Sequence, residues 1–157
     1  MSWGRLVVSL LVPLAVGWLG GTVTARSLQD WYPTLRKPSW NPPDAVFAPV
    51  WTLLFLAMGV ALYRVWGLGA GDPMVRLAMI LFGVQLVLNV LWSVCFFGLR
   101  SPGLALVEIA FLWLSVVAMT LVMGRLDPVA GWLLVPYVAW VSFAAVLNGA
   151  VWRLNRG

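Results

Sequence analysis

Five long apolar stretches divide this chain, and they constrain its fold more than any other feature. A helix needs roughly 20 apolar residues to cross the hydrocarbon core of a bilayer. The stretches run from Leu6 to Ala25, Asp44 to Trp66, Val75 to Phe97, Gly103 to Leu126 and Val129 to Trp152. Of the 157 residues, 62% are hydrophobic and 10% are charged, against roughly 25% charged in a soluble domain. We therefore predict an all-α membrane protein in which residues 1–157 form one domain of five transmembrane helices.

The first apolar stretch also has features of a cleaved secretory signal. Arg5 precedes it, and the small residues at its end, Val23–Ala25, are typical of a cleavage site. However, the apolar run is longer than an ordinary signal core, and Gly17, Gly20 and Gly21 suit close packing between membrane helices. We therefore expect a membrane span rather than a removed leader.

The basic residues lie almost entirely at the ends of the apolar stretches, where they anchor helices to lipid headgroups. With five spans, four of them lie on the side of the N-terminus: Arg5, Arg64, Arg76 and Arg125. Six lie on the side of the C-terminus: Arg26, Arg36, Lys37, Arg100, Arg153 and Arg156. Because cytoplasmic segments carry the excess of Lys and Arg, we expect the C-terminus and the long Arg26–Pro43 link in the cytoplasm, and a bacterial cell membrane as the location.

The composition also excludes several classes of function. The net charge of +5 comes from residues at the membrane surface, so we expect no nucleic-acid binding. The chain has no histidine and one cysteine, Cys95, which lies within an apolar stretch. It therefore lacks the usual general base and the usual transition-metal ligands, and it contains no Walker loop or dinucleotide-binding GxGxxG motif. We expect no metal site and no obligatory cofactor.

A stretch rich in proline and tryptophan, Lys37–Thr52, connects the first two spans. Its prolines fix the backbone φ angle and lack an N–H donor, so no regular structure is expected before Pro43. A helix can begin directly afterwards, with Asp44 as its N-cap. We expect a stiff segment that holds Trp40 and the first aromatic residues of the second span at the mouth of the bundle.

Three spans each carry a stripe of aromatic residues on one helical face. The stripe of the second span contains Phe47, Trp51 and Phe55. That of the third contains Gln85, Asn89, Trp92 and Phe96, and that of the fifth contains Tyr137, Trp140, Ala144, Leu147 and Asn148. The two amides of the third span are equally consistent with interhelical hydrogen bonds and with ligand contact. Because they share a face with tryptophans, we favour an aromatic-lined cavity for a large, planar, apolar ligand.

Two acidic residues need separate explanations. Glu108 lies one to two turns into the fourth span, and we expect it to reach the headgroups or to pair with Arg100. A proton relay would need a chain of acidic or histidine partners, and the sequence offers none. Asp127 directly precedes Pro128 and is expected to cap the fifth helix.

Several runs of sequence resemble the TspO/MBR family, which comprises the tryptophan-rich sensory proteins of bacteria and their relative, the mitochondrial translocator protein or peripheral benzodiazepine receptor. The similar runs are WY (31–32), KPSWNPP (37–43), PVWT (49–52), QLVLNVLW (85–92), FFG (96–98), VPYVAW (135–140), LN (147–148) and WR (152–153). They correspond to the first loop and to the second, third and fifth helices of that family. The resemblance covers nearly the whole chain in the right order.

The resemblance implies a five-helix bundle, often dimeric, that binds porphyrins such as protoporphyrin IX and haem beneath its first loop. The matching pocket residues are Trp51, Asn89, Trp92, Trp140, Ala144 and Leu147, and the matching loop residues are Trp31, Tyr32, Trp40 and Pro42. The implied function is porphyrin transport, sensing or regulation of tetrapyrrole metabolism. An alternative is light-driven porphyrin degradation, with Trp51 and Trp140 as candidate catalytic residues. A third interpretation is a structural membrane protein that binds a partner, in which the aromatic residues only pack together and form no ligand site.

One departure from the family concerns sterol binding. The animal proteins carry a Leu-x-Tyr-x3-Arg pattern in the last helix, and Leu147 and Arg153 stand at its ends here. Gly149 occupies the tyrosine position, so cholesterol binding is not expected. The expected partners are therefore a tetrapyrrole ligand, the lipid membrane and a second copy of the chain.

Overall fold

The computed structural model describes residues 1–157 and contains five long helices and no strand. The helices are α1 (Trp3–Asp30), α2 (Asp44–Trp66), α3 (Pro73–Ser93), α4 (Pro102–Leu126) and α5 (Pro128–Asn155). Two short elements accompany them, the 3-10 helix η1 (Tyr32–Thr34) and the π-helical turn η2 (Val94–Gly98). The predicted five-helix, all-α fold is confirmed.

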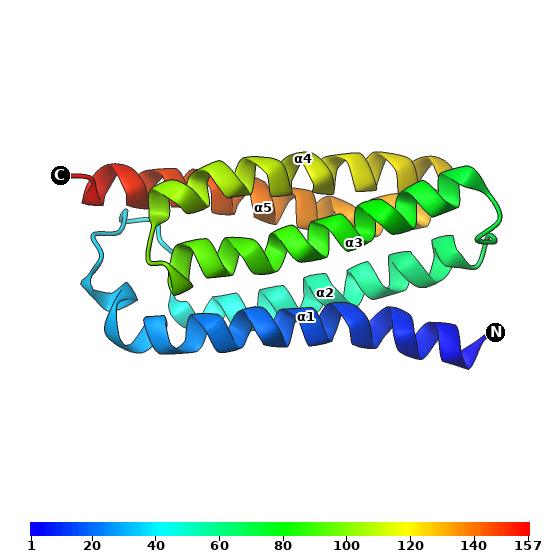
Figure 1. Cartoon of the computed structure of the whole chain (residues 1–157), viewed down its shortest axis with the longest axis horizontal. Coiled ribbons are helices and arrows are strands. Elements are labelled where there is room, and N and C mark those ends of the chain that lie inside the picture. The colour runs from blue at the N-terminus through cyan, green and yellow to red at the C-terminus, as the bar shows by residue number, and fades with distance from the viewer.

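The five helices lie side by side along the long axis of the molecule and alternate in direction, so the two termini lie at opposite ends (Figure 1). The segment Trp31–Pro43, here called the α1–α2 linker, lies at the same end as the C-terminus (Figure 1). Two hydrogen bonds fasten it to α5. The Arg36 N–H donates to Asn155 Oδ1 over 3.0 Å, and Asn155 Nδ2 donates to the Arg36 carbonyl over 2.8 Å.

Polar caps and prolines explain where four of the helices begin. The side chains of Ser2, Asp72, Ser101 and Asp127 each accept a hydrogen bond from a backbone N–H of the first turn, and proline follows directly in α3, α4 and α5. The predicted cap of the fifth helix by Asp127 is therefore confirmed.

The predicted N-cap of the second helix is wrong, because Pro43 occupies the cap position and Asp44 is the first helical residue. Pro43 has an extended backbone (ψ 142°), and its carbonyl already accepts from the N–H of Val46 over 3.0 Å. A carboxylate in the first turn of the helix still interacts favourably with the helix dipole.

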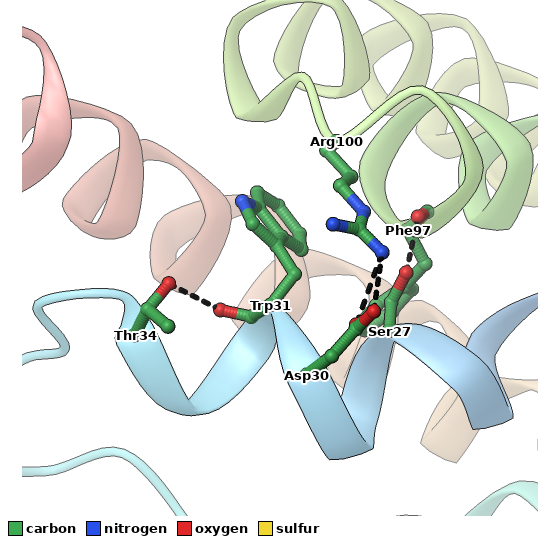
Figure 2. A network of polar contacts seen from close by, with 6 residues as sticks. All are labelled: Ser27, Asp30, Trp31, Thr34, Phe97 and Arg100. Atoms are coloured by element: carbon green, nitrogen blue, oxygen red, sulfur yellow. Dashed lines mark hydrogen bonds and ion pairs between the residues drawn. The ribbon is translucent and has the colours of Figure 1, made fainter.

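The first helix is longer than predicted. It continues five residues beyond Ala25, to Asp30, and this shortens the predicted Arg26–Pro43 link to Trp31–Pro43. Contacts from η2 and from the turn after it hold the extra turn, as Figure 2 shows: Ser27 Oγ donates to the Phe97 carbonyl over 2.5 Å, and Arg100 donates to the carboxylate of Asp30.

The bundle packs tightly around an apolar core formed mainly by α2, α3, α4 and α5. At two crossings the backbones approach so closely that only glycine fits. A Cβ on Gly59 of α2 would lie 2.6 Å from the Ser9 carbonyl of α1, and a Cβ on Gly131 of α5 would lie 2.6 Å from the Gly124 Cα of α4. Small residues let membrane helices approach in this way.

The outer surface of the bundle is apolar. All five helices are long and apolar enough to cross a membrane, when η2 is counted with α3. Large hydrophobic side chains such as Leu53, Phe111 and Val146 are more than half exposed on it. Such a surface is stable in lipid and not in water, which agrees with five membrane-spanning helices.

Of the two roles expected for Glu108, the pairing with Arg100 is wrong. Arg100 lies in the turn after η2 and pairs with Asp30 instead, with 2.8 Å between Nη2 and Oδ2 (Figure 2). Both carboxylate oxygens of Glu108 are buried and have no hydrogen-bond partner. The difference arises because α1 extends far enough to place its own acidic residue beside the turn.

Candidate ligand-binding site

A chain of buried side-chain hydrogen bonds links α3 to α5 near the middle of the bundle. Asn89 Nδ2 donates to the Tyr137 hydroxyl over 3.0 Å, and this hydroxyl donates to Gln85 Oε1 over 2.7 Å. Gln85 Nε2 lies 3.6 Å from the sulfur of Met58. The two amides therefore make interhelical contacts. Gln85 is completely buried, whereas Asn89 leaves its Oδ1 without a hydrogen bond.

A second polar chain joins α3, α4 and α5. The indole N–H of Trp92 donates to Asn148 Oδ1 over 3.0 Å, and Asn148 Nδ2 donates to the Pro102 carbonyl over 2.8 Å. These bonds fix the Trp92 ring and use its only polar atom. The sequence placed Asn148 on the same face as Trp140 and Leu147 but gave it no ligand contact, and the structure shows that it positions Trp92 instead.

The first group of aromatic rings lies between α2 and α5, and we call it the α2–α5 group: Phe47, Trp51, Phe55, Tyr137, Trp140 and Phe143. Trp51 stacks on Phe55 with ring centroids 5.6 Å apart and meets Trp140 edge to face at 6.4 Å. Trp140 also contacts Phe47 at 5.9 Å. The indole N–H of Trp140 is buried and has no hydrogen-bond partner. An unpaired buried donor is costly and rare in a folded protein.

The second group of aromatic rings lies where the α1–α2 linker covers the end of α3, and we call it the linker–α3 group: Trp31, Tyr32, Trp92, Phe96 and Phe97. Trp92 stacks on Phe96 with centroids 5.2 Å apart, and Trp31 meets Phe96 edge to face at 5.7 Å. Trp92 packs against both apolar clusters of the molecule. It therefore connects the region beneath the linker with the centre of the bundle.

Tyr32 is the anchor of the linker. The residue is 5% exposed, and the Lys37 ammonium lies 4.6 Å from the centroid of its ring. Its hydroxyl donates to Asn41 Oδ1 over 3.4 Å. Burial raises the pKa of the Tyr32 hydroxyl, because the phenolate is poorly solvated there. Tyr32 thus remains a neutral packing residue at physiological pH.

The structure brings most of the predicted site residues together. Leu147 is buried in the cluster beneath the linker, and Ala144 packs against the main core. Trp40 is 47% exposed and contacts the α2–α5 group through Phe143, with centroids 5.9 Å apart. Pro42 lies in the linker, where its carbonyl accepts a hydrogen bond from Asn41 Nδ2 over 3.2 Å.

The rings of both groups pack directly on one another. Two depressions of the surface, of about 440 and 450 Å³, lie elsewhere: one at the end of the bundle opposite the linker and one on α3, around Gly83. No cluster of His, Cys, Asp and Glu side chains is arranged to hold a metal ion. The site presents indole faces, the amides of Gln85, Asn89 and Asn148, and the unpaired indole N–H of Trp140.

Comparison with known proteins agrees with this architecture. The sequence pattern of the TspO/MBR family matches residues 9–153. A tryptophan-rich protein TspO from Chlorobaculum tepidum is 49% identical over 142 residues, covering 90% of each chain. A translocator protein from Sus scrofa is 38% identical over 99% of this chain and 92% of its own, and a tryptophan-rich sensory protein from Cereibacter sphaeroides is 40% identical over 99% and 94%.

The matches to the Sus scrofa and Cereibacter sphaeroides proteins extend over nearly the whole of both chains, and the family match of residues 9–153 includes most of each of the five apolar helices. The chain is an integral, multi-pass membrane protein that belongs to the TspO/MBR family.

Proposed function

We propose that this protein binds tetrapyrroles such as protoporphyrin IX or haem within the membrane and acts in porphyrin transport, sensing or the regulation of tetrapyrrole metabolism. The observation that carries the proposal is the buried indole N–H of Trp140, which lacks a partner inside the α2–α5 group. A ligand carboxylate or carbonyl would satisfy it. The names of the relatives, a sensory protein and a translocator protein, support a role of this kind.

The bound ligand would lie between the two aromatic groups, beneath the α1–α2 linker. Its planar ring would stack on Trp51, Trp92 or Trp140, because offset stacking is favourable between flat π systems. The free Oδ1 of Asn89 and the N–H of Trp140 would orient polar groups at its edge. Since the rings pack directly on one another, binding would require the linker to move and the rings to separate.

A titration with protoporphyrin IX tests the proposal. The purified protein in detergent micelles is titrated in the dark, while tryptophan fluorescence and the main porphyrin absorbance band are followed. We expect saturable quenching at micromolar porphyrin, with roughly tenfold weaker binding for Trp140→Phe. The matched control is Trp132→Phe, because Trp132 is 74% exposed on the outer surface. Quenching that never saturates, or a change in the porphyrin absorbance band that is equal in protein-free micelles, would reject a specific site and indicate that the aromatic groups only pack together.

A second candidate function is light-driven porphyrin degradation, favoured by the direct contact of Trp51 with Trp140. A photoexcited porphyrin can take an electron from one of the two touching indoles and pass it to dioxygen, which is reduced to superoxide. The indole radical cation would then take an electron from the ground-state porphyrin, so that the porphyrin is oxidised, dioxygen is the oxidant and the indole is restored. The test is to illuminate the complex in air and to follow the loss of porphyrin absorbance. Trp51→Phe and Trp140→Phe should slow the loss, whereas unchanged rates would show that these residues are not the electron donors.

We also infer a homodimer in a bacterial cell membrane, with the C-terminus and the α1–α2 linker on the cytoplasmic side. The six basic residues at that end, against four at the other, support the orientation. Sterol is not proposed as a ligand, because Gly149 offers no side chain at the tyrosine position of the animal pattern. Mass measurement in detergent and cysteine labelling from either side of the membrane test the dimer and the orientation.

A further inference from the structure

An arginine without an anionic partner lies at the end of the bundle opposite the α1–α2 linker. Arg5 belongs to the first turns of α1, and no salt bridge includes it. Its Nε is buried and has no hydrogen-bond partner. Arginine does not lose its charge in proteins, so this end of the bundle holds an uncompensated cation at the membrane surface.

Packing holds the Arg5 guanidinium in a defined place. Its central carbon lies 5.2 Å from the centroid of the Tyr63 ring, and the position of a Cβ on Gly67 lies 3.4 Å from its Nη2. The side chain is thus fixed between an aromatic ring and the end of α2. A fixed guanidinium loses little further freedom when it binds a ligand.

The two acidic residues at this end of the bundle bond to other groups, so Arg5 has no carboxylate partner. Asp127 pairs with Arg64, with 2.5 Å from Nε to Oδ2 and 3.2 Å from Nη2 to Oδ1, and its Oδ1 also accepts the N–H of Val129. Both of its oxygens are therefore occupied. Asp72, the other acid at this end, accepts from the N–H of Met74 as the cap of α3. Two arginines and one carboxylate leave a net charge of +1 here.

These groups line an open depression of about 440 Å³. Its polar side is formed by Arg5, Arg64 and Asp127, and its apolar side includes Leu68 and Leu126. An anion that binds here must match a planar guanidinium and an adjacent apolar wall. Guanidinium groups bind phosphate through two parallel hydrogen bonds, and phosphate esters of lipids are the anions present at the ends of membrane helices.

We propose that this depression binds a phosphate group, with Arg5 as the contacting residue and the phosphate ester of an anionic phospholipid headgroup as the ligand class. Leu68 and Leu126 would contact the glycerol and the first acyl carbons. The site lies at the end of the bundle opposite the α1–α2 linker (Figure 1) and includes none of the residues of the two aromatic groups, so it does not depend on the proposed tetrapyrrole function.

The test measures the binding of phosphatidylglycerol to the purified protein in phosphate-free detergent, by native mass spectrometry and by the rise in melting temperature. Arg5→Gln should weaken binding about tenfold, and Arg5→Lys should recover only part of it, since lysine lacks the planar fork. The matched control is Arg76→Gln, which removes the same charge from the same end but at an exposed side chain outside the depression.

A second variant keeps the test decisive if Arg5→Gln does not fold. Leu68 is 55% exposed, so Leu68→Glu should fold and should repel phosphate from the depression. Inorganic phosphate is titrated in parallel. Saturable stabilisation by millimolar phosphate that disappears in Leu68→Glu supports the phosphate site with a free ion as its source, whereas stabilisation by the lipid alone identifies the headgroup.

The proposal is overturned if both Arg5→Gln and Leu68→Glu bind phosphatidylglycerol as the unmodified protein does. It is also overturned if Arg5→Gln lowers the melting temperature by the same amount with and without lipid. In that case Arg5 only compensates the negative, C-terminal end of the α2 helix dipole.

Discussion

The Tyr137 hydroxyl donates a hydrogen bond to Gln85 Oε1 over 2.7 Å and so joins the middle of α5 to the middle of α3. It also accepts from Asn89, so its removal in Tyr137→Phe leaves two amides in an apolar core without their partner. We expect the free energy of unfolding to fall by about 1–3 kcal/mol. The change is measured as a lower melting temperature in detergent. Tyr63→Phe is the control, because the Tyr63 hydroxyl makes no hydrogen bond, and equal effects of the two substitutions would contradict the prediction.

Gly59→Ala should destabilise the contact between α1 and α2. The added methyl group would lie 2.6 Å from the Ser9 carbonyl and 3.0 Å from the Leu10 Cα, and these backbone atoms cannot move without shifting the helix. Overpacking of this kind costs about 1–3 kcal/mol. Gly21→Ala is the control, because a Cβ there meets nothing within 4 Å. It should leave the melting temperature unchanged or raise it, since alanine favours the helix. A stable Gly59→Ala variant would show that the two helices can separate at little cost.

The bounds of α2 could be predicted from the sequence because local signals set both of them. Pro43 prevents an earlier start, and Gly67 follows the last helical residue. The end of α1 could not be predicted, because it depends on contacts between residues 70 apart in the chain, from Ser27 to Phe97 and from Asp30 to Arg100. No local pattern contains that information.

The same limit applies to the candidate site. Helical periodicity predicted that Phe47, Trp51 and Phe55 share one face, but not that this face meets Trp140 of α5. It left the role of Gln85 and Asn89 open, because both bond to Tyr137, which lies 52 residues from Gln85 and 48 residues from Asn89. Which faces meet depends on helix packing, which a single sequence does not specify.

Glu108→Gln should stabilise the protein in neutral detergent solution. Both carboxylate oxygens of Glu108 are buried without a hydrogen-bond partner, and an unpaired charge within a membrane span is costly. Glutamine keeps the shape and removes the charge, so we expect a higher melting temperature at pH 7 and above. Glu108→Leu should behave similarly. A lower melting temperature for both variants would indicate that an unseen partner, such as a bound cation or ligand, uses this carboxylate.

Replacing Pro42 and Pro43 with alanine should weaken protoporphyrin binding more than it weakens the fold. Each proline restricts the α1–α2 linker in the unbound protein, by about 0.4–1 kcal/mol, so the double variant must order a looser segment on binding. We expect roughly fivefold to tenfold weaker binding and a melting temperature changed by only a few degrees. Pro128→Ala, at the opposite end of the bundle, should leave binding unchanged. Equal losses of affinity and stability in the double variant would show that the linker is only a scaffold.

The ion pair of Arg64 with Asp127 should make stability depend on pH in the acidic range. The Arg64 guanidinium, with help from the Val129 N–H, holds the pKa of the Asp127 carboxyl below its usual range. Because the pKa is lower in the folded state, the stabilisation is complete above the ordinary Asp pKa of about 4 and is lost as the pH falls through the lowered value. Asp127→Asn keeps an N-cap for α5 but removes the ion pair, so its melting temperature should fall less steeply between about pH 5 and pH 2. Asp127→Ala removes the cap as well and should cost about 1 kcal/mol more at every pH. Parallel melting curves for Asp127→Asn and the unmodified protein over this range would show that the pair does not contribute to folding.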